Sequence, residues 1–432
     1  MLGAIAGDIA GSPYEFDMYN IKTKEFEFMA DVENHPKCRY TDDSVLTLAI
    51  AKALMESKKS NYDNLAERTT HWMRQLGNKY ATKEYGGNFK EWLKNENMGP
   101  YNSCGNGAAM RVSAVGRVAN SLEEVKKLSR IVTEVTHNHK EGIKGAEATA
   151  VAIYLARTGW QIPEIKYYIN ESYYKMDFTL DEIRESYRHV EICQKTVPQA
   201  LEAFFESKNY EDAIRNAVSI GGDSDTIAAI TGGIAEAYWN VPKKISDKAR
   251  KFFINAKELL RILNDFEKEY PPSKMRIDES QISQEEKDLH EEIKSKLENI
   301  KSNETQIISD KELSSTKEVK ANTNPKIDIK TILAIILGIA LLAGTATVAT
   351  LTFGAALIPA LAITKIAIAL GALCTAALFI YAAFNQKTQN DKCRNLSNNS
   401  LTKDDKNSIN TEVTKETNPP SMSEHQQELQ KL

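Results

Sequence analysis

Two short acidic segments carry the residue types that bind hard metal ions. The first is TDDS at residues 41–44, and the second is GGDSDT at residues 221–226. Each directly precedes an apolar stretch that is expected to be helical, so each places oxygen donors at a helix N-terminus, where acidic side chains are favoured. Because Asp, Ser and Thr are also the commonest helix-capping residues, either segment alone is better explained as a cap.

Taken together, the two segments predict a metal site. Adjacent carboxylates repel one another, so several of them beside a buried helix require a cation nearby. Carboxylates and hydroxyls without His or Cys at matching spacing suit Mg²⁺, Mn²⁺ or Ca²⁺ rather than zinc. We therefore expect the two segments to meet in space, although they lie far apart in the sequence.

Three further segments carry candidate groups. Residues 101–107 (YNSCGNG) lead a glycine-rich backbone into an expected helix at 108–118, which suits a phosphate or diphosphate; a plain turn is the alternative. Glu15 is an acid among apolar neighbours just after the first expected helix. His137 and His139 are two residues apart and cannot share one helix face, so they make a poor metal pair.

The elements that must position these groups are helices. Apolar residues recur at helical spacing in residues 1–270, whereas strand-like alternation is scarce. The segment Thr226–Trp239 is apolar on most faces, which predicts a helix at the centre of the bundle. The expected fold is therefore an all-α, compact multi-helix bundle over residues 1–270.

The remainder of the chain differs in composition. Residues 271–330 are rich in charged and polar types and are interpreted as a charged linker, although Gln284–Ile300 could form a charged helix. Residues 331–385 hold two uncharged runs separated by Lys365, each long enough to cross a bilayer, and predict a two-helix membrane hairpin. Residues 386–432 are interpreted as a disordered tail.

The lysines that flank the predicted hairpin place both of its ends, and with them the helical domain at residues 1–270, on the cytosolic side of a membrane. A buried helical pair in a soluble domain is the alternative. The formal net charge of −4 argues against a nucleic-acid partner. The five cysteines lie far apart, which argues against a disulfide framework or a zinc site.

Residues 1 to about 263 resemble the ADP-ribosylglycohydrolase family, which includes the dinitrogenase reductase-activating glycohydrolase and the crystallin J1 relatives. The motifs occur well separated and in the family's order. They are GAIAGDIAGSPYEF, TDDS, SCGNGAAMRV, THNHKEGIKGA and GGDSDTIAAITGGIAEAYW. The resemblance implies an all-α bundle with a two-metal cleft, and hydrolysis of the glycosidic bond between ADP-ribose and a protein side chain or a small conjugate.

The resemblance also implies roles for particular residues. Two Mg²⁺ ions, with Mn²⁺ as the other candidate ion, would grip the distal ribose and position a water molecule. The implied metal ligands are Thr41, Asp42, Asp43, Asp223, Asp225 and Thr226. The implied substrate-binding residues are Ser103, Gly105, Asn106 and Gly107 at the diphosphate, and His137 in the pocket. The expected catalytic residues are Glu15, Asp43 and Asp225, with one of the two aspartates acting as base.

Two positions depart from the family pattern: Ser44 stands where Thr is common, and Cys104 where an aromatic residue is common. The match at Glu15 favours O-linked acceptors, while arginine, nucleic-acid and metabolite linkages stay open. Two other functions stay open. One is a membrane-tethered module that binds ADP-ribose without cleaving it, and the other is a host-directed bacterial effector of the same family.

Overall fold

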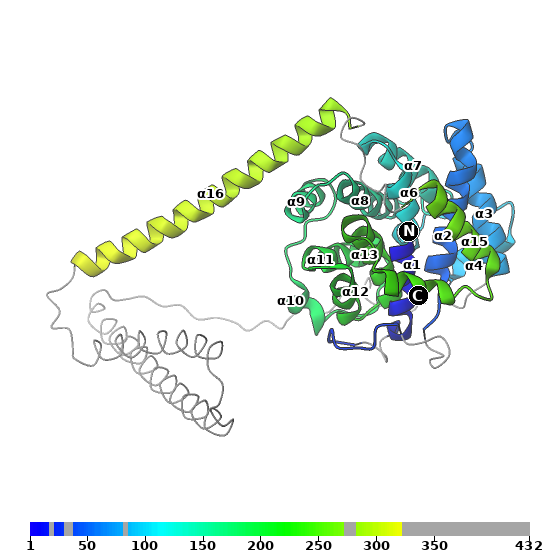
Figure 1. The fold of residues 1–432 in the computed structure, drawn as a ribbon, viewed down its shortest axis with the longest axis horizontal. Coiled ribbons are helices and arrows are strands. Elements are labelled where there is room, and N and C mark those ends of the chain that lie inside the picture. Colours follow the sequence, from blue (N-terminus) through cyan, green and yellow to red (C-terminus); the bar gives the residue numbers. More distant parts are fainter. Residues whose placement is uncertain (17–20, 30–37, 81–84, 272–281, 322–432) are drawn as a thin grey trace, which may run out of the picture. The chain divides into compact units, whose positions relative to one another are not determined.

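The structure, a computed structural model, describes residues 1–16, 21–29, 38–80, 85–271 and 282–321. Within these ranges the regular secondary structure is helical, and the strand-like pairing there is an isolated antiparallel bridge between Gly105 and Ile192 (Figure 1). The α-helices are α1 (Leu2–Gly11), α2 (Asp42–Ser57), α3 (Leu65–Lys79), α4 (Gly87–Lys94), α5 (Gly107–Met110), α6 (Ser113–Val118), α7 (Leu122–Glu134), α8 (Lys140–Arg157), α9 (Ile162–Ser172), α10 (Leu180–Arg184), α11 (Cys193–Phe205), α12 (Tyr210–Ser219), α13 (Ser224–Trp239), α14 (Lys243–Lys251), α15 (Lys257–Glu269) and α16 (Gln284–Ala321). Two 3₁₀ turns are η1 (Ser12–Tyr14) and η3 (Lys58–Ser60). The expectation of an all-α bundle is confirmed for this part of the chain.

Helix α13 lies at the centre of the bundle, in contact with α1, α8, α11 and α12 (Figure 1). Its residues are buried from Ser224 through Glu236. A helix that is apolar all round gains most by being surrounded, since every face then leaves water. The prediction of a central buried helix is confirmed, and its acidic N-terminus is thereby carried into the interior.

Helix α1 packs on α13 through a face made of glycines. Gly3, Gly7 and Gly11 are four residues apart, so they share one side of the helix. A Cβ atom added at Gly7 would lie 2.0 Å from the carbonyl oxygen of Ala228. One added at Gly11 would lie 2.4 Å from the carbonyl oxygen of Ser224. The two helix backbones therefore touch directly, which requires glycine at these positions.

The expected helix at 108–118 is divided in two. Helix α5 ends at Met110 and α6 begins at Ser113, with Arg111 and Val112 between them. At this break the fully buried guanidinium of Arg111 donates from Nη2 to Thr136 Oγ1 at 2.7 Å. A continuous helix was therefore the wrong expectation for this segment, where a charged side chain turns into the interior.

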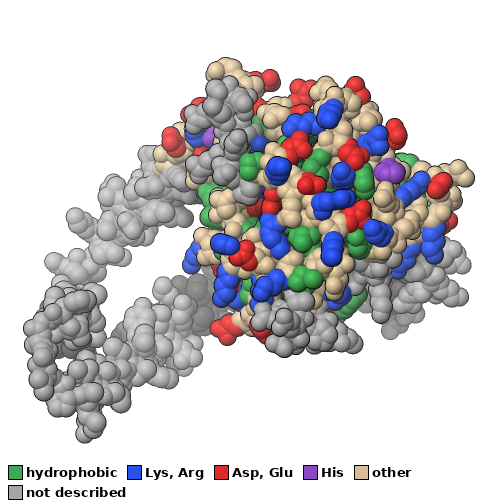
Figure 2. Space-filling model, turned by 45° about the vertical axis from the view of Figure 1, so that its right-hand side comes forward, with side chains coloured by type: hydrophobic (Ala, Val, Ile, Leu, Met, Phe, Trp, Pro, Cys, Tyr) green, Lys and Arg blue, Asp and Glu red, His purple; other side chains and the backbone are tan. Residues whose placement is uncertain are grey.

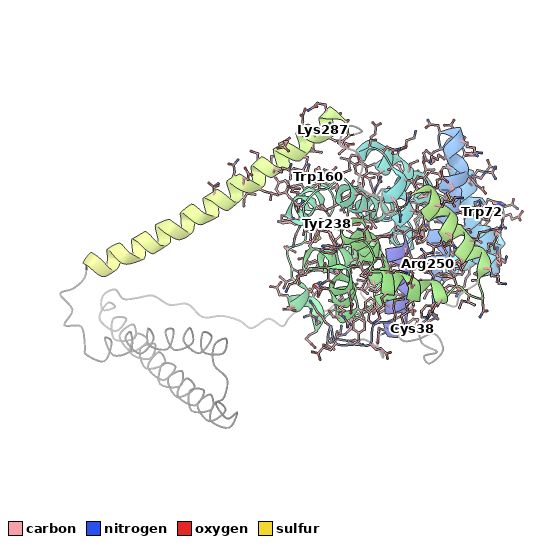
Figure 3. All side chains as sticks on the ribbon, viewed as in Figure 1. Cys38, Trp72, Trp160, Tyr238, Arg250 and Lys287 are labelled. Carbon is pink, nitrogen blue, oxygen red and sulfur yellow. The ribbon has the colours of Figure 1, made fainter. Side chains whose placement is uncertain are left out.

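The predicted linker at 271–330 contains α16, a helix of 38 residues that belongs to the same compact unit as the bundle. Its early turns dock on the domain: the ring of His290 stacks on Trp160 at 4.3 Å, and its Nε2 lies 2.8 Å from Glu164 Oε2. Ile293 is buried in this junction, near which Figure 3 labels Trp160 and Lys287. Leu289 and Leu297, one turn before and one turn after Ile293, also pack against the core of the domain.

The predicted membrane hairpin at 331–385 and the tail at 386–432 lie outside the described residues, so both stay predictions. Among the helices that are described, none is long and apolar enough to cross a membrane. On the face of the bundle seen in Figure 2, basic and acidic side chains are intermingled rather than segregated by sign.

We expect Gly7→Ala to destabilise the protein by about 2 kcal/mol, because the new methyl group forces apart two backbones in contact. The free energy of unfolding of the full-length chain, measured by chemical denaturation, checks this. Gly99→Ala is the matched control, since a Cβ atom at Gly99 meets no atom within 4 Å. Equal stability of the two variants would contradict direct backbone packing of α1 on α13.

Candidate functional site

A cleft of about 210 Å³ opens where the N-termini of α2 and α13 meet the loop that precedes α5. It is the place where the segments singled out in the sequence come together. Of the predicted site residues, those that line it are Glu15, Asp42, Asp43, Ser103, Gly105, Asn106, Gly107, His137, Asp223, Asp225 and Thr226. Thr41 is the predicted site residue that does not line it.

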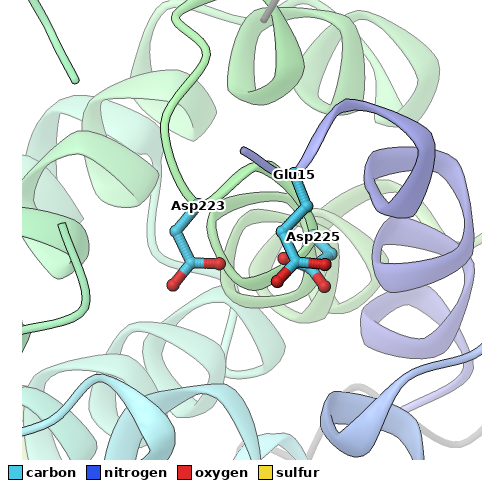
Figure 4. A group of neighbouring side chains, drawn as sticks. All are labelled: Glu15, Asp223 and Asp225. Atoms are coloured by element: carbon cyan, nitrogen blue, oxygen red, sulfur yellow. The ribbon is translucent and has the colours of Figure 1, made fainter. Parts of the chain in front are cut away.

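The two acidic segments converge, as the sequence predicted. The hydroxyl of Thr226 donates to Asp43 Oδ2 at 3.2 Å, a contact between residues 183 positions apart. At the same end of α13, carboxylate oxygens of Glu15, Asp223 and Asp225 lie within 4.8 Å of one another (Figure 4). Glu15 is brought there by α1, and the two aspartates by α13, so the α1–α13 contact builds this cluster.

Asp8 holds the first acidic segment in place, and sequence analysis missed it. This fully buried carboxylate accepts hydrogen bonds from the backbone N–H and hydroxyl of Thr41, at 3.0 and 2.8 Å. It also accepts from the N–H of Ser44, at 3.1 Å, and from the Ser44 hydroxyl. A lone acid in the apolar helix GAIAGDIAG was the available signal, because such a group is buried only when its oxygens are satisfied.

Thr41 has the capping role that the sequence offered as the alternative for this segment. It is the N-cap of α2, and its hydroxyl accepts from the N–H of Asp43 at 3.3 Å while donating to Asp8. The same oxygen lies 3.5 Å from Asp43 Oδ2. Thr41 thus stands behind Asp43, away from the cleft surface, and orients it.

Burial and mutual repulsion disfavour the charged forms of the cleft acids. Desolvation is the main cause that raises the pKa of Asp43 well above its usual range, followed by the charges of Asp8 and Asp42. Desolvation likewise raises the pKa of Asp225, with Asp223 and Glu15 as the next causes. For Asp8, burial raises the pKa to about 6 even though four donors oppose the shift.

The donor set fits a hard divalent cation. Asp43 Oδ1 is buried and has no hydrogen-bond partner among the described residues, which is costly unless another group binds it. Glu15, Asp223 and Asp225 supply carboxylate oxygens close enough together to share an ion. All of these ligand atoms are oxygens, as Mg²⁺ and Mn²⁺ prefer.

Glu15 also forms an ion pair with Arg39. Its Oε2 lies 3.4 Å from a guanidinium nitrogen of Arg39, which is about two-fifths exposed. The backbone N–H of Arg39 donates to the hydroxyl of Ser12 at 3.1 Å, which joins the chain before α2 to the turn after α1. Glu15 is thus a nearly buried acid on a turn that two other segments hold.

The glycine-rich loop is tied to the acidic cluster. The side-chain amide of Asn106 donates to Asp223 Oδ2 at 2.6 Å, and its backbone N–H donates to the carbonyl of Glu191 at 2.8 Å. Ser103 Oγ accepts from the N–H of Gly105 at 3.1 Å. Cys104, which departs from the family pattern, does not line the cleft. The loop therefore lies directly beside the carboxylates.

His137 and Arg111 line the cleft together with this loop. Nδ1 of His137 is 2.7 Å from the Thr136 hydroxyl, and its ring lies 5.9 Å from that of Tyr101. Burial, and then the charge of Arg111, hold the pKa of His137 well below its usual range, so its ring is neutral. Burial lowers the pKa of Arg111 to about 10, which leaves it charged at neutral pH. Its Nε and Nη1 have no hydrogen-bond partner among the described residues.

His189 and Glu191 also line the cleft, and no sequence signal singled them out. Nε2 of His189 lies 3.0 Å from Glu191 Oε1. This contact is the main cause that raises the pKa of His189 to about 9, opposed by burial and assisted by the charge of Asp223. The imidazole is therefore a cation at neutral pH, close to the acidic cluster.

The sequence comparisons with known proteins agree on one family. A family model described as ADP-ribosylglycohydrolase matches residues 1–273. The chain is 25% identical to ADP-ribosylhydrolase ARH3 of Xenopus tropicalis, over 57% of this chain and 71% of the relative. It is 27% identical to ADP-ribosylarginine hydrolase Tri1 of Pseudomonas putida (strain GB-1), over 56% and 70%. A solved structure titled ADP-ribosylglycohydrolase-related protein complex is 20% identical, covering 62% of this chain and 96% of its own, with a TM-score of 0.43.

The cleft acids predict how stability depends on pH without metal. A carboxyl whose pKa is raised on folding stabilises the native state at low pH. For Asp8 this stabilisation is fully present below the unfolded pKa of 3.8 and is lost as the pH rises through the folded pKa of about 6. In EDTA, we expect the Tm of the full-length chain to fall across this range. Asp43→Asn should raise the Tm at pH 7 by a few degrees, because the uncharged amide removes the repulsion between Asp43 and the neighbouring acids.

Asp247→Asn is the control for this experiment, since Asp247 lies on the surface of α14 and pairs with Lys243. Added Mg²⁺ should raise the Tm of the wild type at pH 7 and raise that of Asp43→Asn less. A lower Tm of metal-free Asp43→Asn at pH 7 would show that the Asp43 charge is not a source of repulsion.

Proposed function

Because the chain belongs to the ADP-ribosylglycohydrolase family, a family of hydrolases, we propose that this cleft cleaves the glycosidic bond between ADP-ribose and an acceptor side chain, with two Mg²⁺ ions as cofactor. The convergence of the acidic segments on Glu15 is the observation that carries the proposal. Glycoside cleavage passes through an oxocarbenium-like state, which carboxylates and a positioned water molecule serve. The cleft gathers such carboxylates from three separate segments of the chain.

The carboxylates divide into two groups by their surroundings. Asp42, Asp43 and Thr226 would hold one ion, and Asp223 and Asp225, with Glu15 beside them, the other. The hydroxyl of Thr41 orients Asp43 from behind. When bound, such ions orient the ribose hydroxyls and stabilise negative charge in the transition state. Asp8 fixes the loop that carries Asp42 and Asp43, so the ligands are positioned before substrate arrives.

The chain's own residues account for the proton transfers. The oxygen of a water molecule bonds to the anomeric carbon while the bond from that carbon to the acceptor breaks. Asp43 or Asp225 is the proposed base that takes the proton from the water, since both carboxylates line the cleft. Glu15, at the edge of the cluster, returns a proton to the departing acceptor atom or controls access to it.

The nucleotide part of the substrate has its own residues. Gly105, Asn106 and Gly107 present backbone at the start of α5, and Ser103 supports this loop, an arrangement suited to a diphosphate. The charged guanidinium of Arg111 lines the same cleft and favours an anionic ligand there. The neutral ring of His137, with Tyr101 beside it, offers a flat surface without positive charge.

We expect the full-length chain to release ADP-ribose from a peptide that is mono-ADP-ribosylated on serine or on arginine, when Mg²⁺ is present and not in EDTA. Asp225→Asn should lower the rate by more than about a hundredfold, because it removes a ligand and a candidate base in one change. Asp247→Asn on the surface should retain wild-type turnover. Chromatographic detection of free ADP-ribose measures both.

The relatives include an ADP-ribosylhydrolase and an ADP-ribosylarginine hydrolase, so both acceptor types belong in the test. Release from one peptide alone identifies the acceptor class. Tight binding of ADP-ribose without release from either peptide would instead support the binding module. Full turnover by Asp225→Asn would rule out the proposed role of the acidic cluster.

We propose from the sequence that residues 331–385 anchor the protein in a membrane, with the hydrolase domain on the cytosolic side. The two uncharged runs are the basis for this. Full-length protein should stay in the membrane fraction after alkaline extraction. Leu342→Arg with Leu378→Arg should be released, since each arginine costs roughly 3 kcal/mol within a span. Release of the wild type under the same treatment would contradict anchoring.

A further inference from the structure

Phe16 is an unusual residue at the edge of the cleft. Its side chain is 48% exposed, and the other large hydrophobic residues exposed in the described part of the chain are Ile254 and Ile300. Its backbone has a φ of 68°, in the left-handed region that a bulky residue rarely adopts. An exposed ring forfeits burial, and the backbone conformation adds strain. Phe16 therefore combines an unfavourable exposure with an unfavourable backbone conformation, directly after Glu15.

The backbone conformation separates the two neighbouring side chains. Glu15 is only 7% exposed, with its carboxylate among those of Asp223 and Asp225, whereas the ring of Phe16 faces out. Strained residues of this kind concentrate where function requires a particular orientation. Here the ring leaves the acidic cluster and lies against His189, a residue of the cleft wall.

The ring of Phe16 is supported from one side by the cleft wall. It stacks on the imidazole of His189, with ring centroids 5.7 Å apart and an angle of 27° between the planes. His189 lines the cleft and is held by Glu191, whose backbone carbonyl accepts from Asn106. One face of the ring is therefore fixed against the wall, and the remaining surface is left for another molecule.

The position of Phe16 favours the acceptor over the nucleotide as its partner. The proposed nucleotide residues, Ser103 to Gly107 and His137, come from different segments and have Tyr101 as their own aromatic neighbour. Phe16 instead follows Glu15 directly, so it lies within one peptide unit of the group proposed to act on the departing acceptor. Exposed aromatic rings are also the side chains that protein-binding surfaces favour.

We propose that Phe16, backed by His189, is the acceptor-binding platform of the cleft and packs against the peptide chain that flanks the ADP-ribosylated side chain. This inference rests on the proposed hydrolase function. It assigns a substrate-contacting residue outside the acidic motifs and implies that the preferred substrate is a modified protein or peptide rather than a modified free amino acid. Apolar packing of this kind does not require a particular peptide sequence.

The test compares two substrates that share one glycosidic linkage, on a short peptide and on the corresponding free amino acid. For the full-length chain, Phe16→Ala should raise KM for the peptide about tenfold, the loss expected when the packing of one large apolar ring is removed. The kcat for the peptide and the kinetics on the free amino acid conjugate should change by less than about twofold. Phe16→Tyr keeps an aromatic ring, so its KM for the peptide should be close to that of the wild type.

Two controls keep the result specific. Ile254→Ala removes another exposed apolar side chain of the same domain, at 61% exposure, and should change neither substrate's kinetics. The affinity for free ADP-ribose, measured by calorimetry, should be the same for Phe16→Ala and wild type. Weaker ADP-ribose binding would show that the ring contacts the nucleotide, and the proposal would be wrong.

Other outcomes also decide the question. An equal loss on both substrates would mean that Phe16 only positions Glu15, and an unchanged peptide KM would mean that nothing packs on the ring; either result overturns the platform. Failure of the wild type to cleave serine-linked and arginine-linked conjugates alike would instead refute the hydrolase function itself, and it is recognised without any variant.

Discussion

Direct backbone contact between α1 and α13 determines where the acidic groups of the cleft lie. The contact requires glycine at positions 3, 7 and 11, because a Cβ atom at any of them would overlap α13. Three consequences follow along α1. Asp8 is brought under the segment that starts α2, Ser224 donates to the carbonyl of Tyr14 at 3.0 Å, and Glu15 reaches the aspartates of α13. A wider separation of the two helices would break all three.

This packing brings buried carboxylates close together, which is electrostatically unfavourable. Asp8 and Asp43 differ in how far the surrounding protein compensates for this. Asp8 accepts four hydrogen bonds from Thr41 and Ser44, so it is satisfied within the protein and acts as a structural support. Asp43 has one oxygen without a partner among the described residues and repulsion from its neighbours. Its surroundings are those of a ligand prepared for a cation, since only an added positive charge removes both costs.

The cleft combines this acidic centre with cationic and neutral surroundings. Arg111 and His189 are charged at neutral pH, while His137 is neutral. Asn106 connects the two regions, because its side chain binds Asp223 and its backbone binds the segment that carries His189. A substrate with an anionic diphosphate and a neutral ribose beside it matches this order of charges. The outward-facing ring of Phe16 then extends the site toward the acceptor.

The sequence by itself determined the helical class, the central position of α13, and the placement of oxygen donors at two helix N-termini, because periodicity and capping act over a few residues. It also identified most of the residues that line the cleft. The tertiary structure decided which of them meet: Asp43 and Thr226 are 183 positions apart, and no local rule relates them. In the folded protein Thr41 lies behind the cleft surface, and the side chain of Arg111 points inward at a helix break. Helix α16 packs on the domain through His290. These outcomes depend on how closely helix backbones approach and which buried polar groups then need partners, and both are properties of the packed molecule.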